Sequence, residues 1–141
     1  MKFQFFTSNS YQTKKAGRLL AEEIIKSKSR KQAFVFGLVG DLGGGKTTFL
    51  QGLASGLGIK DKILSPTFII MRRSGNFYHL DCYRIKKPQE ILDLGFKEII
   101  ANPGNIVAVE WADYIRKIMP KDAIWIEFEF LGENKRKIVV R

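Results

Sequence analysis

Residues 40–47 of this chain read GDLGGGKT, which satisfies the pattern G-x-x-x-x-G-K-[ST] in full. An apolar run at residues 33–39 precedes this motif, and apolar residues at helical spacing follow it as far as Gly58. The run predicts a buried strand and the spacing predicts a helix, which is the context of a P-loop. In a P-loop, backbone N–H groups of the glycine-rich loop bind phosphate oxygens at the positive end of the helix dipole. The alternative is a structural glycine turn, and the agreement of both flanking elements argues against it.

The side chains of the motif are expected to differ in their roles. Lys46 would pair with the β- and γ-phosphates, Thr47 would join the Mg²⁺ shell, and Thr48 would help to hold the α-phosphate. Asp41 and Leu42 are interpreted as residues that set the geometry of the loop. The predicted nucleotide-binding residues of this stretch are Asp41, Leu42, Gly43, Gly44, Gly45, Lys46, Thr47 and Thr48.

A P-loop site also needs carboxylates that hold the metal or position a nucleophile. His79, Asp81 and Tyr83 alternate along a predicted strand and so share one of its faces, which makes Asp81 the first metal candidate. Glu110 follows the apolar run at residues 106–109, at the carboxyl end of a buried strand, where ligands of open α/β sheets collect. It is expected to bind Mg²⁺ through water or to orient an attacking water. For each acid, the alternative is a surface or capping carboxylate, and His79 by itself is interpreted as a structural histidine.

Helical and strand-like patterns alternate along the rest of the chain. Helical spacing and capping residues predict helices at residues 10–27, 88–94 and 111–119. Strand patterns on either side of turn residues predict antiparallel hairpins at residues 67–83 and 123–141. We therefore predict an α/β fold, with a P-loop NTPase-like three-layer core and a mixed β-sheet that includes antiparallel hairpins.

The length and the composition favour one domain without a membrane segment. A chain of 141 residues can bury a single core, so a single P-loop ATPase domain is expected over residues 1–141. The longest apolar run is too short to span a bilayer, and the N-terminus lacks the apolar region of a secretory signal. Cys82 is the one cysteine and has no partner for an internal disulfide. These features predict a cytoplasmic protein.

The charge of the chain favours anionic partners. Lys and Arg number 24 against 14 Asp and Glu, which gives a formal net charge of +10. Nucleotides, RNA and acidic protein surfaces would all be attracted. The basic residues form small clusters along the chain, so a solvated surface is the simpler interpretation and a tRNA contact the alternative.

Four motifs occur in a fixed order: GDLGGGKTTF at residues 40–49, SPTF at 65–68, HLDCYR at 79–84 and EW at 110–111. In these motifs, and over nearly its whole length, the chain resembles the TsaE (formerly YjeE) family, the small bacterial ATPases of tRNA threonylcarbamoyladenosine biosynthesis. The resemblance implies binding and hydrolysis of ATP with Mg²⁺ in a complex with the TsaD and TsaB proteins. It also implies support for modification of the adenosine beside the anticodon of ANN-decoding tRNAs, without transfer of the threonylcarbamoyl group by this chain.

The resemblance also assigns roles to single residues. Thr67 would lie in a loop that senses the γ-phosphate, while Ser8 and Arg136 would flank the nucleotide. Gly44 stands where the family often has alanine, which should loosen the loop slightly. The catalytic residues implied are Lys46, Thr67, Asp81 and Glu110. The metal-binding residues implied are Thr47, Asp81 and Glu110.

Three other functions compete with this one. A small GTPase would need an Asn-Lys-x-Asp motif, and residues 134–137 read NKRK, which lacks the acid, so ATP is preferred to GTP. A small P-loop kinase usually carries an arginine-bearing lid, and no lid insertion is evident. An ATP-sensing RNA-binding switch without turnover is favoured by the basic surface alone. No arginine-finger motif is evident near the P-loop, so a slow ATPase completed by partner contact is expected.

Overall fold

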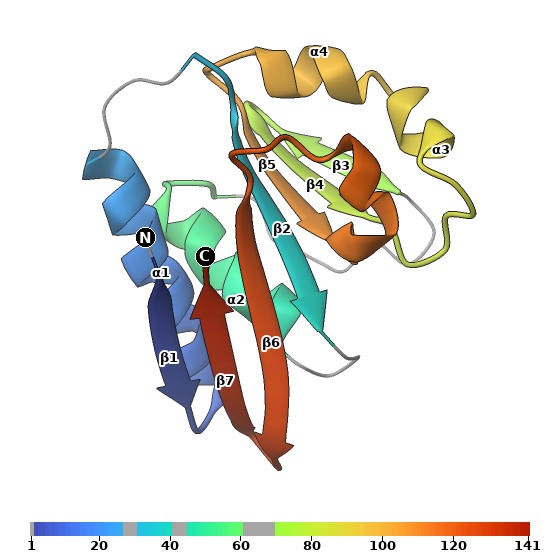
Figure 1. The fold of residues 1–141 in the computed structure, drawn as a ribbon. Helices are drawn as coiled ribbons and strands as arrows, with labels where there is room; N and C mark the ends of the chain where they lie inside the picture. The colour runs from blue at the N-terminus through green and yellow to red at the C-terminus, as the bar shows by residue number, and fades with distance from the viewer. Residues whose placement is uncertain (1, 27–30, 41–44, 61–69) are drawn as a thin grey trace. The chain divides into compact units, whose positions relative to one another are not determined.

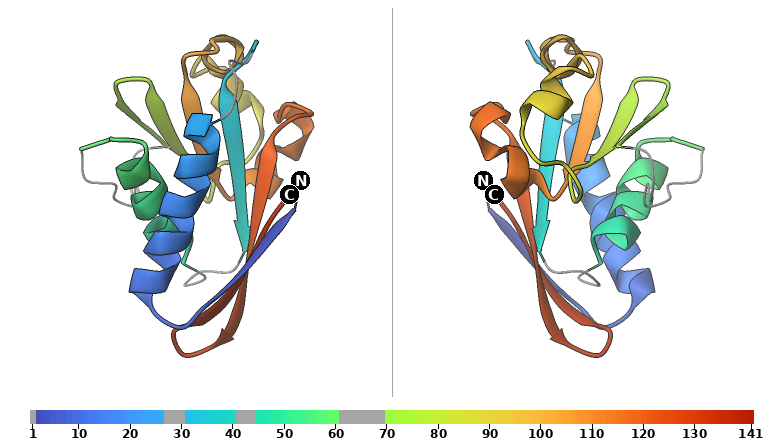
Figure 2. Two further views of the ribbon diagram at one scale, coloured as in Figure 1. Left: turned by 90° about the vertical axis from the view of Figure 1, so that its left-hand side faces the viewer. Right: turned by 90° about the vertical axis from the view of Figure 1, so that its right-hand side faces the viewer.

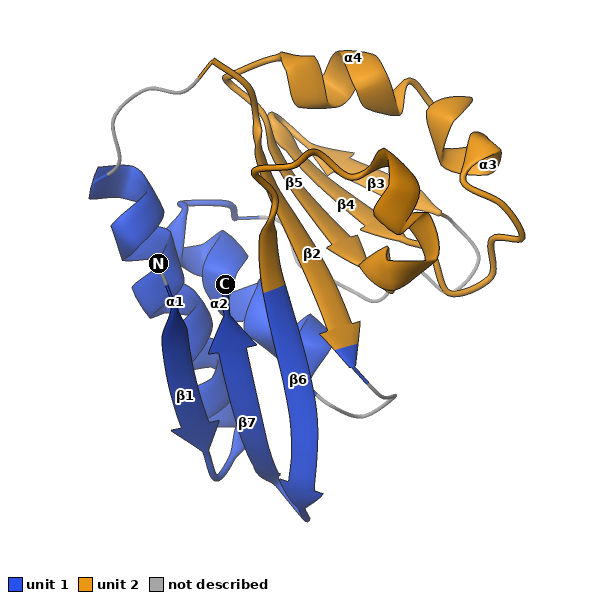
Figure 3. Cartoon of the chain, in the orientation of Figure 1, with its two compact units in different colours: residues 1–28, 40–65, 126–141 blue, residues 29–39, 66–125 orange. Residues whose placement is uncertain are grey.

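The computed structural model describes residues 2–26, 31–40, 45–60 and 70–141, whose helices and strands alternate along the chain (Figure 1). They belong to two compact units, one formed by residues 1–28, 40–65 and 126–141 and the other by residues 29–39 and 66–125 (Figure 3). The expected α/β class, with parallel strands and antiparallel hairpins, is confirmed. The single domain over residues 1–141 stays a prediction.

The first unit combines two helices with antiparallel strands. The strand order is β1-β7-β6, and the pairs run from Phe3 opposite Val140 to Thr7 opposite Arg136 between β1 and β7. The predicted β6–β7 hairpin is confirmed, with Asn134 in the left-handed region at its turn (φ 62°). β1 was not predicted. The elements are β1 (Phe3–Thr7), α1 (Ser10–Lys26), α2 (Lys46–Gly56), β6 (Ile124–Gly132) and β7 (Lys135–Val140), the first two residues of β6 belonging to the second unit.

The predicted start of α1 is confirmed by reciprocal capping bonds. The Asn9 side-chain oxygen accepts the backbone N–H of Gln12 at 2.8 Å, and the Gln12 side-chain oxygen accepts the backbone N–H of Ser8 at 2.6 Å. These bonds satisfy donors that the first turn of a helix cannot pair internally. The chain therefore turns from β1 into α1 at a defined residue.

Helices α1 and α2 lie side by side in both views of Figure 2. Their backbones approach so closely that a Cβ atom on Gly17 would lie 2.7 Å from the backbone nitrogen of Leu53. A Cβ atom on Gly56 would likewise lie 2.6 Å from the side chain of Ala21. Only glycine fits at such positions, so α1 determines where α2 begins and ends. The Phe49 ring of α2 packs edge-on against Phe128 of β6, with centroids 5.5 Å apart.

The second unit contains a mixed sheet in the order β2-β5-β4-β3. β5 pairs in parallel with both β2 and β4, while β3 pairs antiparallel with β4. The predicted hairpin is confirmed around Gly75 (φ 58°), although its first strand begins only at Met71 and residues 67–69 lie outside the described part of the chain. The strands are β2 (Phe34–Gly40), β3 (Met71–Ser74), β4 (Phe77–Asp81) and β5 (Ile106–Glu110), the last residue of β2 belonging to the first unit.

Three short helices complete the second unit. They are α3 (Gln89–Leu92), α4 (Phe96–Ala101) and the 3-10 helix η1 (Ala112–Ile118). The helices predicted around α3 and η1 are confirmed, whereas α4, which follows Gly95 in the left-handed region (φ 89°), was not predicted. The side chain of Glu90 accepts the backbone N–H groups of Lys86 and Lys87 at 2.6 and 3.1 Å, and these bonds hold the pKa of Glu90 below its usual value.

The second unit has an apolar core of its own, built from β2, β4, β5 and the helices around them. Its buried side chains include those of Val35, Leu80, Cys82, Ile91, Phe96, Val107, Val109 and Ile115. No helix in the described part of the chain is both long and apolar enough to cross a membrane.

Candidate functional site

Lys46 is the first residue of α2 and bridges the two ends of the glycine-rich loop. Its ammonium nitrogen donates a hydrogen bond of 2.7 Å to the carbonyl oxygen of Gly40, the last residue of β2. Gly45, immediately before α2, is in the left-handed region (φ 94°), which glycine adopts without strain. The predicted strand and helix are therefore confirmed, whereas residues 41–44 of the predicted loop lie outside the described part of the chain.

Lys46 occupies an uncommon position for a cation. The residue is only 6% exposed, and it lies at the positive end of the α2 dipole. The first turn of α2 contains no acidic residue. A buried cation at this end of a helix costs free energy unless an anion or a strong acceptor lies beside it. A phosphate group would compensate both the ammonium charge and the helix dipole.

Arg136 of β7 extends beside the glycine that precedes α2. A Cβ atom on Gly45 would lie 3.9 Å from the Arg136 Nε atom. One terminal nitrogen of the guanidinium donates to the carbonyls of Gly132 and Lys135, and the guanidinium carbon lies 4.7 Å from the centroid of the Phe130 ring. Within the described residues, Nε of Arg136 is the one buried side-chain nitrogen or oxygen without a hydrogen-bond partner. The structure thus brings an unsatisfied donor of Arg136 to the end of the predicted P-loop.

The residues around Ser8 contribute mainly to the local fold. Ser8 is exposed, and its backbone N–H caps α1 through Gln12. Next to it, the hydroxyl of Thr7 forms a buried hydrogen bond of 2.9 Å with the hydroxyl of Thr13. The Thr13 methyl group would lie 3.5 Å from a Cβ atom on Gly45. The N-terminal part of α1 therefore approaches Gly45 through Thr13, a contact that sequence reasoning missed.

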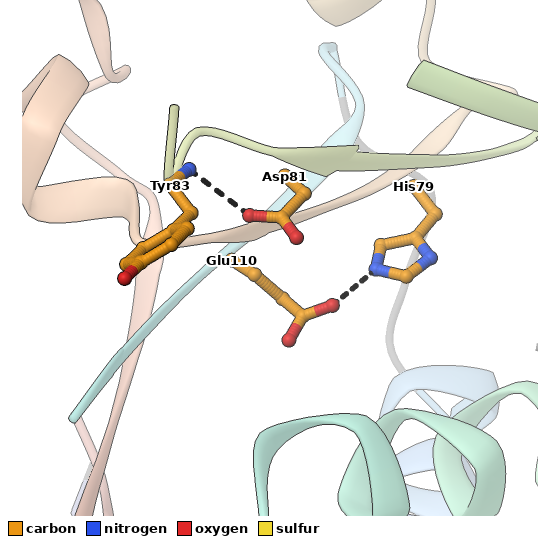
Figure 4. A network of polar contacts seen from close by, with 4 residues as sticks. All are labelled: His79, Asp81, Tyr83 and Glu110. Atoms are coloured by element: carbon orange, nitrogen blue, oxygen red, sulfur yellow. Dashed lines mark hydrogen bonds and ion pairs between the residues drawn. The ribbon is translucent and has the colours of Figure 1, made fainter. Parts of the chain in front are cut away.

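The two predicted carboxylates come together in the second unit. Asp81 ends β4, Glu110 ends β5, and the two residues are direct neighbours in the parallel register. Parallel strands end at the same edge of a sheet, which explains why residues far apart in the sequence meet there. Figure 4 shows both side chains together with those of His79 and Tyr83.

Glu110 forms a buried pair with the one histidine of the chain. The distance between His79 Nε2 and Glu110 Oε2 is 2.6 Å, and the two side chains are 2% and 4% exposed. The imidazole tautomer with its proton on Nε2 would donate this hydrogen bond to the carboxylate oxygen. The sequence placed His79 on the same strand face as Asp81 but did not indicate that it contacts Glu110.

The carboxylate of Asp81 is oriented by a different hydrogen-bond donor. Its Oδ1 atom accepts the backbone N–H of Tyr83 at 3.0 Å, a local bond that fixes the carboxylate at the end of β4. Among the described residues, no three His, Cys, Asp or Glu side chains come close enough to hold a metal ion by themselves. Mg²⁺ is usually bound by one or two carboxylates together with phosphate oxygens and water. The oxygen donors of Asp81 and Glu110 fit such a partial shell.

The chain turns sharply directly after Glu110. Trp111 is in the left-handed region (φ 57°), which is uncommon for a residue other than glycine. Its ring packs between those of Tyr83 and Tyr114, with centroid separations of 5.0 and 5.7 Å. These aromatic contacts hold the backbone that carries the Glu110 carboxylate.

Cys82 is a core residue of the second unit. Its side chain is fully buried among the apolar residues of the second unit. Burial, with smaller contributions from the charges of Asp81 and Asp113, raises the pKa of its thiol to about 12. The thiol therefore stays protonated near neutral pH, which excludes a role as a thiolate nucleophile.

The predicted site residues fall into three groups. Described in the first unit are Ser8, Gly45, Lys46, Thr47, Thr48 and Arg136. Described in the second unit are Asp81 and Glu110. Outside the described residues lie Asp41, Leu42, Gly43, Gly44 and Thr67.

Comparisons with known proteins agree with the resemblance of the motifs. The family model of the threonylcarbamoyl adenosine biosynthesis protein TsaE matches residues 7–138. The TsaE protein of Rickettsia felis is 37% identical over 134 residues, covering 92% of this chain and 74% of the relative. That of Bacillus subtilis is 37% identical over 136 residues, covering 94% and 80%. A crystal structure of Bacillus subtilis YdiB matches with a TM-score of 0.75 at 30% identity, covering 99% of this chain and 84% of that one. The chain belongs to the TsaE family of threonylcarbamoyl adenosine biosynthesis proteins.

Proposed function

We propose that this chain binds ATP with Mg²⁺ and hydrolyses it slowly. The observation that carries the proposal is the buried ammonium group of Lys46 at the positive end of α2, where a phosphate anion would stabilise the structure. The relatives are named for tRNA threonylcarbamoyladenosine biosynthesis, which supports this process as the one in which the proposed ATPase acts.

The described motif residues have separate roles in this proposal. Lys46 would bind the β- and γ-phosphates, and the Thr47 hydroxyl would join the Mg²⁺ shell. Asp81 and Glu110 would hold the metal directly or through water, and Arg136 would donate to the nucleotide beside Gly45. Mg²⁺, when bound, neutralises charge on the phosphate oxygens during transfer.

We infer slow turnover by the chain alone from the hydrogen bonds of Arg136. Nη1 of Arg136 donates to two backbone carbonyls of the β6–β7 turn, so the guanidinium is partly committed to the fold. We therefore assign the completion of the hydrolytic site to the partner proteins TsaD and TsaB. This chain, TsaD and TsaB would together support modification of the adenosine beside the anticodon of ANN-decoding tRNAs. The role in tRNA modification also leads us to propose a cytoplasmic location and, through the basic surface, a tRNA contact.

Nucleotide binding is tested first with the Lys46→Ala variant. Charge-assisted hydrogen bonds to phosphate contribute about 1.5–3 kcal/mol each, so the variant should bind ATP at least about 100-fold more weakly. Lys60→Ala is the matched control, because Lys60 is an exposed lysine just beyond the other end of α2. Normal ATP affinity in Lys46→Ala would refute the phosphate assignment.

Turnover is tested by Mg²⁺-dependent phosphate release from ATP, with and without the TsaD and TsaB proteins of the same organism. We expect slow release by the chain alone, stimulation by the pair, and loss of both in Lys46→Ala. Equal turnover with and without the pair would instead favour a P-loop kinase acting on another acceptor. Salt-sensitive tRNA binding without any turnover would favour an RNA-binding switch.

A further inference from the structure

The buried pair of His79 and Glu110 joins two strands across the sheet of the second unit. In the parallel register His79 lies beside Ala108 and Asp81 beside Glu110, so the glutamate reaches diagonally back along β4 to the imidazole (Figure 4). The bond of 2.6 Å is short for a hydrogen bond between nitrogen and oxygen. The glutamate side chain is thereby fixed in one direction at the end of β5.

Stability alone does not explain this pair. Removing a carboxylate and an imidazole from water costs free energy, and apolar side chains of similar volume often fill such a site at no loss. Phe77 and Ala108, which lie two residues before His79 and Glu110 on the same face of the sheet, are buried apolar residues. The sheet at this level therefore does not depend on a polar pair for its packing.

We propose that His79 is a positioning residue that orients the Glu110 carboxylate toward the Mg²⁺ of the bound nucleotide. This inference rests on the proposed function, in which Glu110 contributes to the metal shell. A glutamate has three side-chain torsions, and an unheld carboxylate would lose entropy on each binding event. The imidazole restricts that freedom in advance, as residues behind the ligands of metal sites commonly do.

The two carboxylates of the site accept hydrogen bonds from different donors. Asp81 accepts the backbone N–H of Tyr83, a bond that involves neither His79 nor Glu110. We therefore expect loss of the imidazole donor to loosen Glu110 and to leave the bond between Asp81 and Tyr83 in place. The expected consequence is weaker Mg²⁺ binding rather than loss of the nucleotide.

The test compares His79→Leu with His79→Gln in the full chain. Leucine fills the space without a donor, whereas glutamine brings an amide N–H near the position of Nε2. Val107→Ala is the control for general loss of stability, because Val107 is fully buried in β5 and lies outside the polar pair. Affinity for a fluorescent ATP analogue is measured in EDTA and then during a Mg²⁺ titration.

We expect His79→Leu to raise the Mg²⁺ concentration at half-saturation by about 10- to 100-fold, the usual effect of losing a group that orients a metal ligand. His79→Gln should recover a large part of this loss. Affinity in EDTA should stay at the wild-type value in all three variants, which also shows that they are folded. In a Glu110→Gln background the leucine substitution should have little additional effect.

Several results would overturn the inference. An unchanged Mg²⁺ titration in His79→Leu, no recovery with glutamine, or equal losses with and without Mg²⁺ would each reduce His79 to a structural residue. An effect of the same size in Val107→Ala would do so too. If the wild-type chain itself binds the nucleotide without any Mg²⁺ dependence, the proposed function fails instead, so the two failures are distinguishable.

Discussion

Alanine at Gly52 should destabilise the first unit through the contact between α1 and α2. A Cβ atom there would overlap the carbonyl oxygen of Lys14 and lie 2.7 Å from its carbonyl carbon. Because these atoms belong to the backbone, no side-chain rotation can relieve the overlap, and the helices must separate by about 1 Å to reach normal carbon–carbon distances. Overpacking of this kind costs about 3 kcal/mol, and the better helix propensity of alanine offsets about 1 kcal/mol. The net loss of unfolding free energy is about 2 kcal/mol.

Urea unfolding followed by circular dichroism measures this loss, and a thermal scan should show Tm lowered by about 4–8 °C. Ser55→Ala is the control, because Ser55 is exposed on the same helix and its replacement improves helix propensity without a steric contact. A second readout is the affinity for ATP, which should also fall because α2 carries Lys46 at its first residue. If Gly52→Ala were as stable as Ser55→Ala, the close approach of the two helix backbones would be refuted.

Three further predictions concern titration and binding. The pKa of Cys82 is raised from 9.0 to about 12, and the resulting stabilisation of the folded state is fully present below pH 9. The unfolding free energy should therefore fall as pH rises from the lower pKa to the higher one, by about 2 kcal/mol near pH 10.5. Urea titrations of Cys82→Ala should lack this loss. The lowered pKa of Glu90 stabilises the folded state above pH 4.5, the usual pKa of this group. This stabilisation is lost as pH falls through the lowered pKa. The protection factors of the amides in α3, which are corrected for the intrinsic exchange rate, should therefore fall in acid, and Glu90→Gln should remove this pH dependence. Arg136→Met should weaken ATP binding, and unchanged affinity would contradict its proposed donor role.

The strand, loop and helix around Lys46 could be predicted because their signals are local. An apolar run, a glycine cluster and helical spacing follow one another within the range over which a sequence pattern can be read. The start of α1 was equally local, since Asn9 and Gln12 provide its cap within one turn. Local chemistry accounts for these elements without reference to the rest of the chain.

Two elements depend on contacts that no local pattern reveals. β1 forms because its residues pair with β7 at the opposite end of the chain, and its own alternation is weak since Phe6 is 65% exposed. α4 has only six residues, so its sequence contains too few turns for a periodicity to emerge. Both elements are stabilised by tertiary contacts rather than by propensity.

The pairing of His79 with Glu110 likewise depends on a contact that no local sequence pattern reveals. Each residue was placed on a strand by its own pattern, but the bond depends on the parallel register of β4 and β5, across 31 residues of sequence. A shift of one residue would turn His79 to the other face of the sheet. Candidate residues could therefore be named from the sequence, whereas their contacts required the structure.

The charges of the two units favour one kind of ligand. In the first unit, Lys46 lies at the positive end of a helix and Arg136 has an unsatisfied buried donor, so an anion would stabilise both. In the second unit, Asp81 and Glu110 are neighbours at the ends of parallel strands, and their carboxylate oxygens are the ligand type that Mg²⁺ prefers. The first unit is not arranged for the greatest stability of the free chain, since an acidic residue in the first turn of α2 would interact more favourably with the helix dipole. A complex of ATP with Mg²⁺, the ligand that we propose, would supply an anion to Lys46 and Arg136 and a cation to the two carboxylates.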